Sequence, residues 1–183
     1  MSSDNFINNK SILSELDLTK HEITLLKSLE DFYDKTNYFS RLKNIIDGNS
    51  NISRRTIEYF VTNYSKKTRV LIECQNKTFN VHSSYKDQLK AHKKKYFDPF
   101  GRGVRIPFFY KDSYIITTIA QLNFYKWFFQ RNIYDYCLTN LNEIQHSLSK
   151  STKNFKNKVE KNKNNTVEPK PTSSKRNIIV NFD

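Results

Sequence analysis

The sequence has very little glycine and cysteine, and it has no long apolar run. Three glycines in 183 residues leave almost no material for a glycine-rich phosphate loop, which argues against nucleotide-binding folds of the Walker or Rossmann type. Two cysteines, Cys74 and Cys137, are too few for a disulfide scaffold or a four-cysteine zinc site. No stretch approaches the roughly 20 apolar residues that a membrane helix needs, and residues 1–10 lack the apolar core of a secretory signal. We therefore expect an intracellular protein that is not secreted, does not enter a membrane and uses no cofactor.

Basic residues are in excess, and they are unevenly distributed. The chain has 31 Lys and Arg against 18 Asp and Glu, a formal net charge of +13. Residues 51–105 carry 13 basic and 4 acidic residues, whereas residues 1–50 carry 6 and 8. AT-rich codons favour lysine, but codon bias would spread lysine evenly along the chain. The net charge of +9 over residues 51–105 therefore indicates an electrostatic footprint for polyanions.

The hydrophobic pattern predicts a single folded domain with tails. The expected parts are a flexible leader (residues 1–17), a basic core domain (18–148), a disordered basic linker (149–175) and an apolar docking segment (176–183). Within the core, apolar residues recur at helical spacing, and two β-prone runs around Gln75-Asn76 predict a hairpin. We therefore predict an α+β fold that is predominantly helical, with a small β-hairpin or sheet and a disordered basic C-terminal tail.

Three capping-box spacings mark expected helix starts, because each places a hydroxyl three residues before a side chain that can reach back to it. The pairs are Thr19 with Glu22, Ser84 with Asp87, and Thr118 with Gln121. The helix after Thr118 is almost wholly aromatic or aliphatic, so it is expected at the centre of the fold. Asp98-Pro99 is expected to end the helix that begins after Ser84.

The strongest functional candidate is a set of basic side chains within residues 51–105. They are Arg54, Arg55, Lys66, Lys67, Arg69, Lys86, Lys90, Lys93, Lys94, Lys95, Arg102 and Arg105. Cationic sets of this kind bind phosphate backbones by releasing condensed counterions, with no base contact required. For any one lysine a solvated helix face is the simpler interpretation, but the charge asymmetry favours binding for the set as a whole.

Two more specific binding motifs are weaker alternatives. Residues 37–67 can be drawn as a helix-turn-helix with Arg54 and Arg55 at the start of the second helix. However, the link from Asp47 to Ser53 is longer than the usual 3–4 residues, so an ordinary packing pair is preferred. Cys74, His82 and His92 are metal-ligand types, but their spacing matches no standard zinc pattern, so no metal site is predicted.

Catalytic arrangements are also weakly represented. Glu73, Asp87 and Asp98 are candidate carboxylates of a nuclease, but such sites need acidic groups that converge on metal ions, and two of these three are expected at helix ends. No nucleophile with a matching base is evident, so we assign no catalytic residues and predict a protein that is not an enzyme, with a nuclease as the minority alternative. Aromatic residues interleave with the basic segment and could stack on single strands, although most of them are expected in the core. They are Tyr85, Tyr96, Phe97, Phe100, Phe108, Phe109 and Tyr110.

Three segments resemble a known family. They are residues 60–67 (FVTNYSKK), 84–100 (SYKDQLKAHKKKYFDPF) and 121–124 (QLNF). Together they are similar to small proteins of unknown function encoded by large nucleocytoplasmic DNA viruses of the mimivirus type, over roughly residues 50–140. The resemblance implies a viral context, and with it a location in the host cytoplasm, the viral factory or the virion. It implies no activity or fold.

We therefore predict a viral nucleic-acid-binding protein, DNA or RNA, that contacts the phosphate backbone and serves genome packaging, transcription or replication. The alternative is a non-enzymatic structural or adaptor protein of the virion or of a viral protein complex. Its docking element would be Ile178, Ile179, Val180 and Phe182 near the end of the chain. An apolar segment of this kind can add as a β-strand to this core or to another protein.

Overall fold

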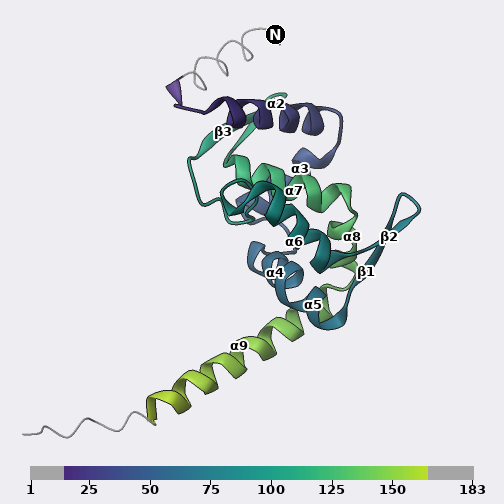
Figure 1. Cartoon of the computed structure of the whole chain (residues 1–183), viewed down its shortest axis with the longest axis vertical. Helices are drawn as coiled ribbons and strands as arrows, with labels where there is room; N and C mark the ends of the chain where they lie inside the picture. The colour runs from purple at the N-terminus through teal and green to yellow at the C-terminus, as the bar shows by residue number, and fades with distance from the viewer. Residues whose placement is uncertain (1–14, 165–183) are drawn as a thin grey trace, which may run out of the picture. The chain divides into compact units, whose positions relative to one another are not determined.

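The computed structural model describes residues 15–164, and the side chains of residues 15–155. Figure 1 labels most of the elements, which follow one another along the chain in this order: α2 (Lys20–Asp34), α3 (Tyr38–Asp47), α4 (Arg54–Tyr59), the π-helix η1 (Phe60–Tyr64), α5 (Ser65–Thr68), β1 (Leu71–Cys74), β2 (Lys77–Asn80), α6 (Val81–His92), the 3-10 helix η2 (Lys94–Tyr96), β3 (Ile106–Tyr110), β4 (Ser113–Thr117), α7 (Ile119–Gln130), α8 (Ile133–Thr139) and α9 (Leu141–Asn164). The fold is α+β and mostly helical, which confirms the predicted class. None of the helices described is long and apolar enough to cross a membrane.

The chain divides into two units between Leu148 and Ser149. In the first unit, α7 is the central helix, and Figure 1 shows it surrounded by α2, α3, α6 and α8. Nearly every α7 side chain is buried, and Leu122, Phe124 and Phe128 are completely inaccessible. Burying apolar surface is the main favourable contribution to folding. The central position predicted for this helix is therefore confirmed.

The start of α2 is fixed by the capping box that the sequence predicts. The backbone N–H of Thr19 donates to Glu22 Oε2 at 2.9 Å, and the backbone N–H of Glu22 donates to Thr19 Oγ1 at 3.3 Å. The buried side of α2 then packs against α7. There the hydroxyl of Tyr33, which has no exposed surface, donates to the carbonyl oxygen of Leu122 at 3.0 Å. A buried hydroxyl needs such a partner, because an unpaired one is costly.

The helix predicted to follow Ser53 is interrupted by a π-helical turn. α4, η1 and α5 run on continuously, and the π-helical hydrogen bonds span Phe60–Tyr64. The carbonyl oxygen of Val61 accepts a hydrogen bond from Ser65 Oγ at 3.0 Å and lies 3.3 Å from His82 Nδ1 of α6. Side-chain donors thus satisfy a carbonyl in the irregular turn and hold α6 against it.

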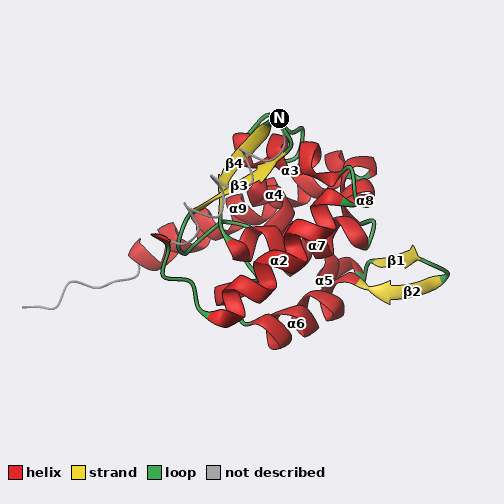
Figure 2. Cartoon of the chain, turned by 90° about the horizontal axis from the view of Figure 1, so that it is seen from above, coloured by secondary structure: helices red, strands yellow, loops and turns green. Residues whose placement is uncertain are grey.

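Two small antiparallel sheets complete the first unit. β1 and β2 form the predicted hairpin, with Gln75 and Asn76 in its turn at φ +52° and +57°, as a two-residue hairpin turn requires. β3 and β4 form a second hairpin closed by Lys111 and Asp112. Figure 2 shows the two hairpins on different sides of the helical body, with β1–β2 projecting from it.

Some elements differ from the sequence predictions. α6 begins at Val81, because Asn80 Oδ1 accepts from Ser83 N–H at 2.9 Å, so the cap predicted at Ser84 is wrong. α6 also ends at His92, ahead of Asp98-Pro99. Residues 149–164 continue α9 where a disordered linker was expected. No proline or glycine interrupts residues 141–164, so nothing in the sequence stops the helix there.

Candidate functional site

The predicted basic side chains fall into three groups in the structure. Seven lie on α5, on α6 and at the residues that follow each helix, and all seven are exposed. We call them the basic ridge: Lys66, Lys67, Arg69, Lys86, Lys90, Lys93 and Lys94. α5 and α6 pack against each other, and they lie side by side in both views (Figures 1 and 2). The structure therefore places the members of this group on two neighbouring helices and directly after them.

Local contacts fix the positions of α5 and α6, which carry the basic ridge. Val81 N–H at the start of α6 donates to the carbonyl oxygen of Val70 at 3.1 Å, which joins the beginning of α6 to the end of α5. Lys86, Lys90 and Lys93 then follow at spacings of four and three residues, so they lie along one side of α6. α6 has 12 residues and is therefore about 18 Å long. No ridge side chain forms an ion pair with an acidic side chain of residues 15–155.

Two other predicted cations are paired with carboxylates, which makes them less available to bind a polyanion. Lys95 Nζ lies 3.1 Å from Glu22 Oε1 of α2, and Arg102 Nε lies 3.3 Å from Asp98 Oδ2. The hydrogen bond from Thr19 N–H, together with the Thr19 hydroxyl and Lys95, lowers the pKa of Glu22 to about 2. Glu22 is therefore ionised at neutral pH, so it partly neutralises Lys95.

The remaining predicted cations lie apart from the ridge. Arg54, at the start of α4, and Arg105, just before β3, line a shared hollow beside β4 together with Lys43 of α3. Arg55 is exposed on α4. α3 packs against β4 and η1 packs against α6. Six residues separate α3 from α4, more than the 3–4 of a usual helix-turn-helix.

Buried polar side chains of α7 orient the loop that carries Lys95 and Arg102. Asn123 Nδ2 donates to the carbonyl oxygen of Tyr96 at 2.9 Å, and Gln121 Nε2 donates to that of Pro99 at 3.0 Å. Gly101 lies so close to Gln121 that a β-carbon would be 2.4 Å from its Oε1. Sequence reasoning missed this arrangement. The sequence signal for it was the pair of amide side chains, Gln121 and Asn123, in the first turns of a mostly apolar helix.

The candidate zinc ligands and the candidate nuclease carboxylates do not lie together in the structure. Cys74 Sγ donates to the carbonyl oxygen of Gln130, and His92 stacks on Phe97 with ring centroids 6.2 Å apart. Among the side chains described, those of residues 15–155, no group of three His, Cys, Asp or Glu could hold a metal. Glu73 is exposed on β1 and Asp87 is exposed on α6, whereas Asp98 is buried.

The aromatic residues near the basic segment belong mainly to the core. Tyr85, Phe97 and Phe108 are buried, so they cannot stack on bases. Tyr96, Phe100, Phe109 and Tyr110 are partly exposed. The docking residues Ile178, Ile179, Val180 and Phe182 lie outside the residues that the structure describes.

Comparison with known proteins supports the viral context. Residues 2–181 match the "Family of unknown function (DUF7197)". "Uncharacterized protein L507" of Acanthamoeba polyphaga mimivirus is 32% identical over 176 residues, which cover 90% of this chain and 68% of that protein. No solved structure matches. The resemblance to a mimivirus-type family is confirmed, and it extends over nearly the whole chain rather than over residues 50–140 alone.

Proposed function

The chain belongs to the DUF7197 family, and we propose that it is a nucleic-acid-binding protein that contacts the phosphate backbone through the basic ridge. Its role would be that of an accessory in viral genome packaging, transcription or replication. The observation that carries this proposal is that seven exposed cations lie on two packed helices and directly after them, without acidic partners among the described side chains.

Charge is separated within the first unit in a way that supports such binding. Residues 54–94 contain ten basic and three acidic residues. The acidic side chains Glu22, Glu30, Asp31 and Asp34 lie on α2, and α2 and α5 lie at opposite ends of this unit (Figure 1). The end of α6 adjoins α2, since Lys95 pairs with Glu22 at 3.1 Å. A polyanion is therefore attracted mainly to α5 and the first turns of α6 and repelled from α2, which also orients its approach.

The dimensions of the ridge suit a duplex. Lys86 and Lys90 are one helical turn apart, a separation of about 5–6 Å between their β-carbons. A helix of about 18 Å spans a length of DNA duplex that carries about ten charges on its two strands, because the duplex has one charge per roughly 1.7 Å of its axis. Lysine ammonium groups act as point charges and contact phosphates without reading bases. We therefore expect binding with little sequence preference.

A pair of matched variants tests the proposal. The ridge variant replaces Lys86, Lys90, Lys93 and Lys94 with Glu. The control variant replaces Lys20, Lys27, Lys35 and Lys111, which are exposed elsewhere, with Glu. Each variant lowers the formal net charge from +13 to +5, because every replacement changes the charge by two units.

The measurement is fluorescence anisotropy with labelled duplex DNA, single-stranded DNA and RNA. We expect the ridge variant to lose binding and the control variant to keep most of it. Equal losses in the two variants would show that only net charge matters, and they would refute the assignment to the ridge. Deleting residues 176–183 is expected to leave this binding unchanged.

A further inference from the structure

The β3–β4 hairpin has one strand edge that is suited to pairing with another strand. Its turn contains two residues, so Tyr110 and Ser113 form the first hydrogen-bonded pair. Pairs alternate along an antiparallel ladder, so Phe109 and Tyr114 form a pair that is not hydrogen-bonded. The same holds for Pro107 and Ile116. The backbone polar groups of these residues therefore point outwards, away from the partner strand.

The two outer edges of the hairpin are not equivalent. On β3, Pro107 has no N–H, so this edge lacks a donor at the position where an added strand would need one. On β4, both Tyr114 and Ile116 present an N–H and a carbonyl oxygen at the outer edge. No other strand pairs with β4 within residues 15–164. β4 is therefore the edge that can accept a strand.

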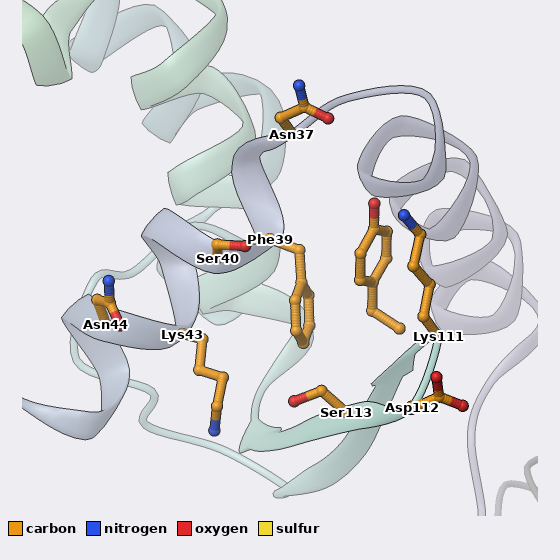
Figure 3. Close-up of a pocket in the computed structure, with 9 residues that line it drawn as sticks. Asn37, Phe39, Ser40, Lys43, Asn44, Lys111, Asp112 and Ser113 are labelled. Atoms are coloured by element: carbon orange, nitrogen blue, oxygen red, sulfur yellow. The ribbon is translucent and has the colours of Figure 1, made fainter.

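The β4 edge borders a hollow with charged groups towards both of its ends. The hollow has a volume of about 570 Å³ and lies beside residues 113–116 of β4; its other side is formed by Lys43, Ile46 and Asp47 of α3 and by Arg54. Asp112 lies at the turn end of this hollow, and Arg105 lies near the other end of the strand, next to Ile106, which pairs with Thr117. Figure 3 shows Asp112 and Ser113 at the turn, with Lys43 extending from α3 nearby. Neither Asp112 nor Arg105 forms an ion pair with the described side chains.

We propose that β4 pairs antiparallel with β4 of a second copy of this chain. Tyr114 of each copy lies opposite Ile116 of the other, and the two hairpins form a four-stranded sheet about a two-fold axis. An antiparallel arrangement brings the turn end of one β4 towards the far end of the other. The negative Asp112 of one copy therefore approaches the positive Arg105 of the other, and the symmetry repeats this contact.

Apolar side chains on β4 favour a second copy of this chain as the partner of the β4 edge. Tyr114 is 57% exposed and Ile116 is 46% exposed, and both lie on the outer face of the hairpin. Cross-strand pairs of an aromatic and a β-branched residue stabilise sheets, and pairing two copies creates two such contacts. The contact is small, so the dimer belongs to the weak, concentration-dependent class.

Proline substitutions at matched edge positions test the proposal. Ile116→Pro removes an outward N–H from β4 without removing a bond to β3, because Ile116 faces Pro107. Phe109→Pro makes the same change on β3 and serves as the control. The full chain and both variants are compared by sedimentation equilibrium over a range of concentrations, with circular dichroism to confirm folding.

We expect wild type and Phe109→Pro to dimerise. Ile116→Pro is expected to raise the dissociation constant by about 10- to 100-fold, because two symmetric hydrogen bonds are lost. A wild-type chain that remains monomeric at every concentration overturns the proposal. A dimer weakened by Phe109→Pro but not by Ile116→Pro also overturns it.

A charge-exchange experiment keeps the test valid if the proline variants unfold. Asp112→Lys and Arg105→Glu should each weaken self-association, whereas an equimolar mixture of the two variants should recover it, since both contacts then join opposite charges. A mixture that associates no better than either variant alone contradicts the two-fold arrangement. Deletion of residues 176–183 should leave the dimer intact, and its loss would identify the C-terminal segment as the occupant instead.

Discussion

The side-chain amide of Gln121 donates a hydrogen bond of 3.0 Å to the carbonyl oxygen of Pro99. Its oxygen accepts from the Thr117 hydroxyl at 3.1 Å, and the whole residue is buried. The loop between η2 and β3 is therefore held from inside the core rather than by its own turn. Gly101 lies directly against the same amide, which makes it the most constrained glycine of this chain.

Gly101→Ala should destabilise the protein by about 3 kcal/mol. Gly101 has φ +67°, and an added β-carbon would meet Gln121 Oε1 at 2.4 Å, so backbone strain and overpacking add together. The control is Gly48→Ala, which also has a positive φ of +82° but has nothing within 4 Å and should cost about 1 kcal/mol. Urea denaturation measures both. Equal losses at the two positions would show that Gln121 does not confine this loop.

Glu22 should make stability depend on pH in the acid range. Its pKa in the folded protein is about 2, below the usual value of 4.5. The folded state therefore binds this proton less readily than the unfolded state. The contribution is fully present above about pH 4.5 and is lost as the pH falls from 4.5 towards 2.

We expect Glu22→Gln to reduce that acid-dependent loss by about 1–2 kcal/mol, the range typical of a helix cap. The free energy of unfolding is measured by urea denaturation at several pH values between 2 and 6. Glu15→Gln, at an exposed position outside the capping box, is the control and should leave the pH dependence unchanged. An unchanged slope in Glu22→Gln would mean that the capping box does not hold the carboxylate.

Both thiols should be unreactive in the folded protein. Cys74 and Cys137 are buried, and burial raises the pKa of Cys137 well above its usual range. Because only the thiolate reacts, Ellman's reagent should label neither cysteine under native conditions and both in guanidinium chloride. Rapid labelling of one equivalent in the native protein would contradict this packing.

Local patterns predicted those parts of the fold in which neighbouring residues decide the structure. The Thr19–Glu22 capping box and the turn at Gln75-Asn76 are both present. Each depends on contacts within a few residues. The helix after Thr118 begins as predicted, but the Gln121 side chain bonds Thr117 and Pro99 instead of completing the capping box.

Features that depend on distant residues could not be read from such patterns. β4 was missed, although Tyr114-Ile115-Ile116-Thr117 is β-prone, because its role depends on pairing with β3. The start of α6 moved to Val81, whose N–H bonds Val70 across the hairpin. For the candidate site, the net positive charge of residues 51–105 indicated the basic ridge. It gave no indication that Glu22 and Asp98 take Lys95 and Arg102 as partners, or that Arg54 and Arg105 line a separate hollow.

The salt dependence of duplex DNA binding tests the central claim most directly. If each of the seven ridge cations neutralises one phosphate, the logarithm of the binding constant should fall against the logarithm of salt concentration with a slope of about −6. Replacing Lys86, Lys90, Lys93 and Lys94 with Glu should flatten the slope to about −3 or less, whereas the Lys20, Lys27, Lys35 and Lys111 variant should retain about −6. A ridge variant with the wild-type slope, or a wild-type protein whose binding does not respond to salt, would contradict the account.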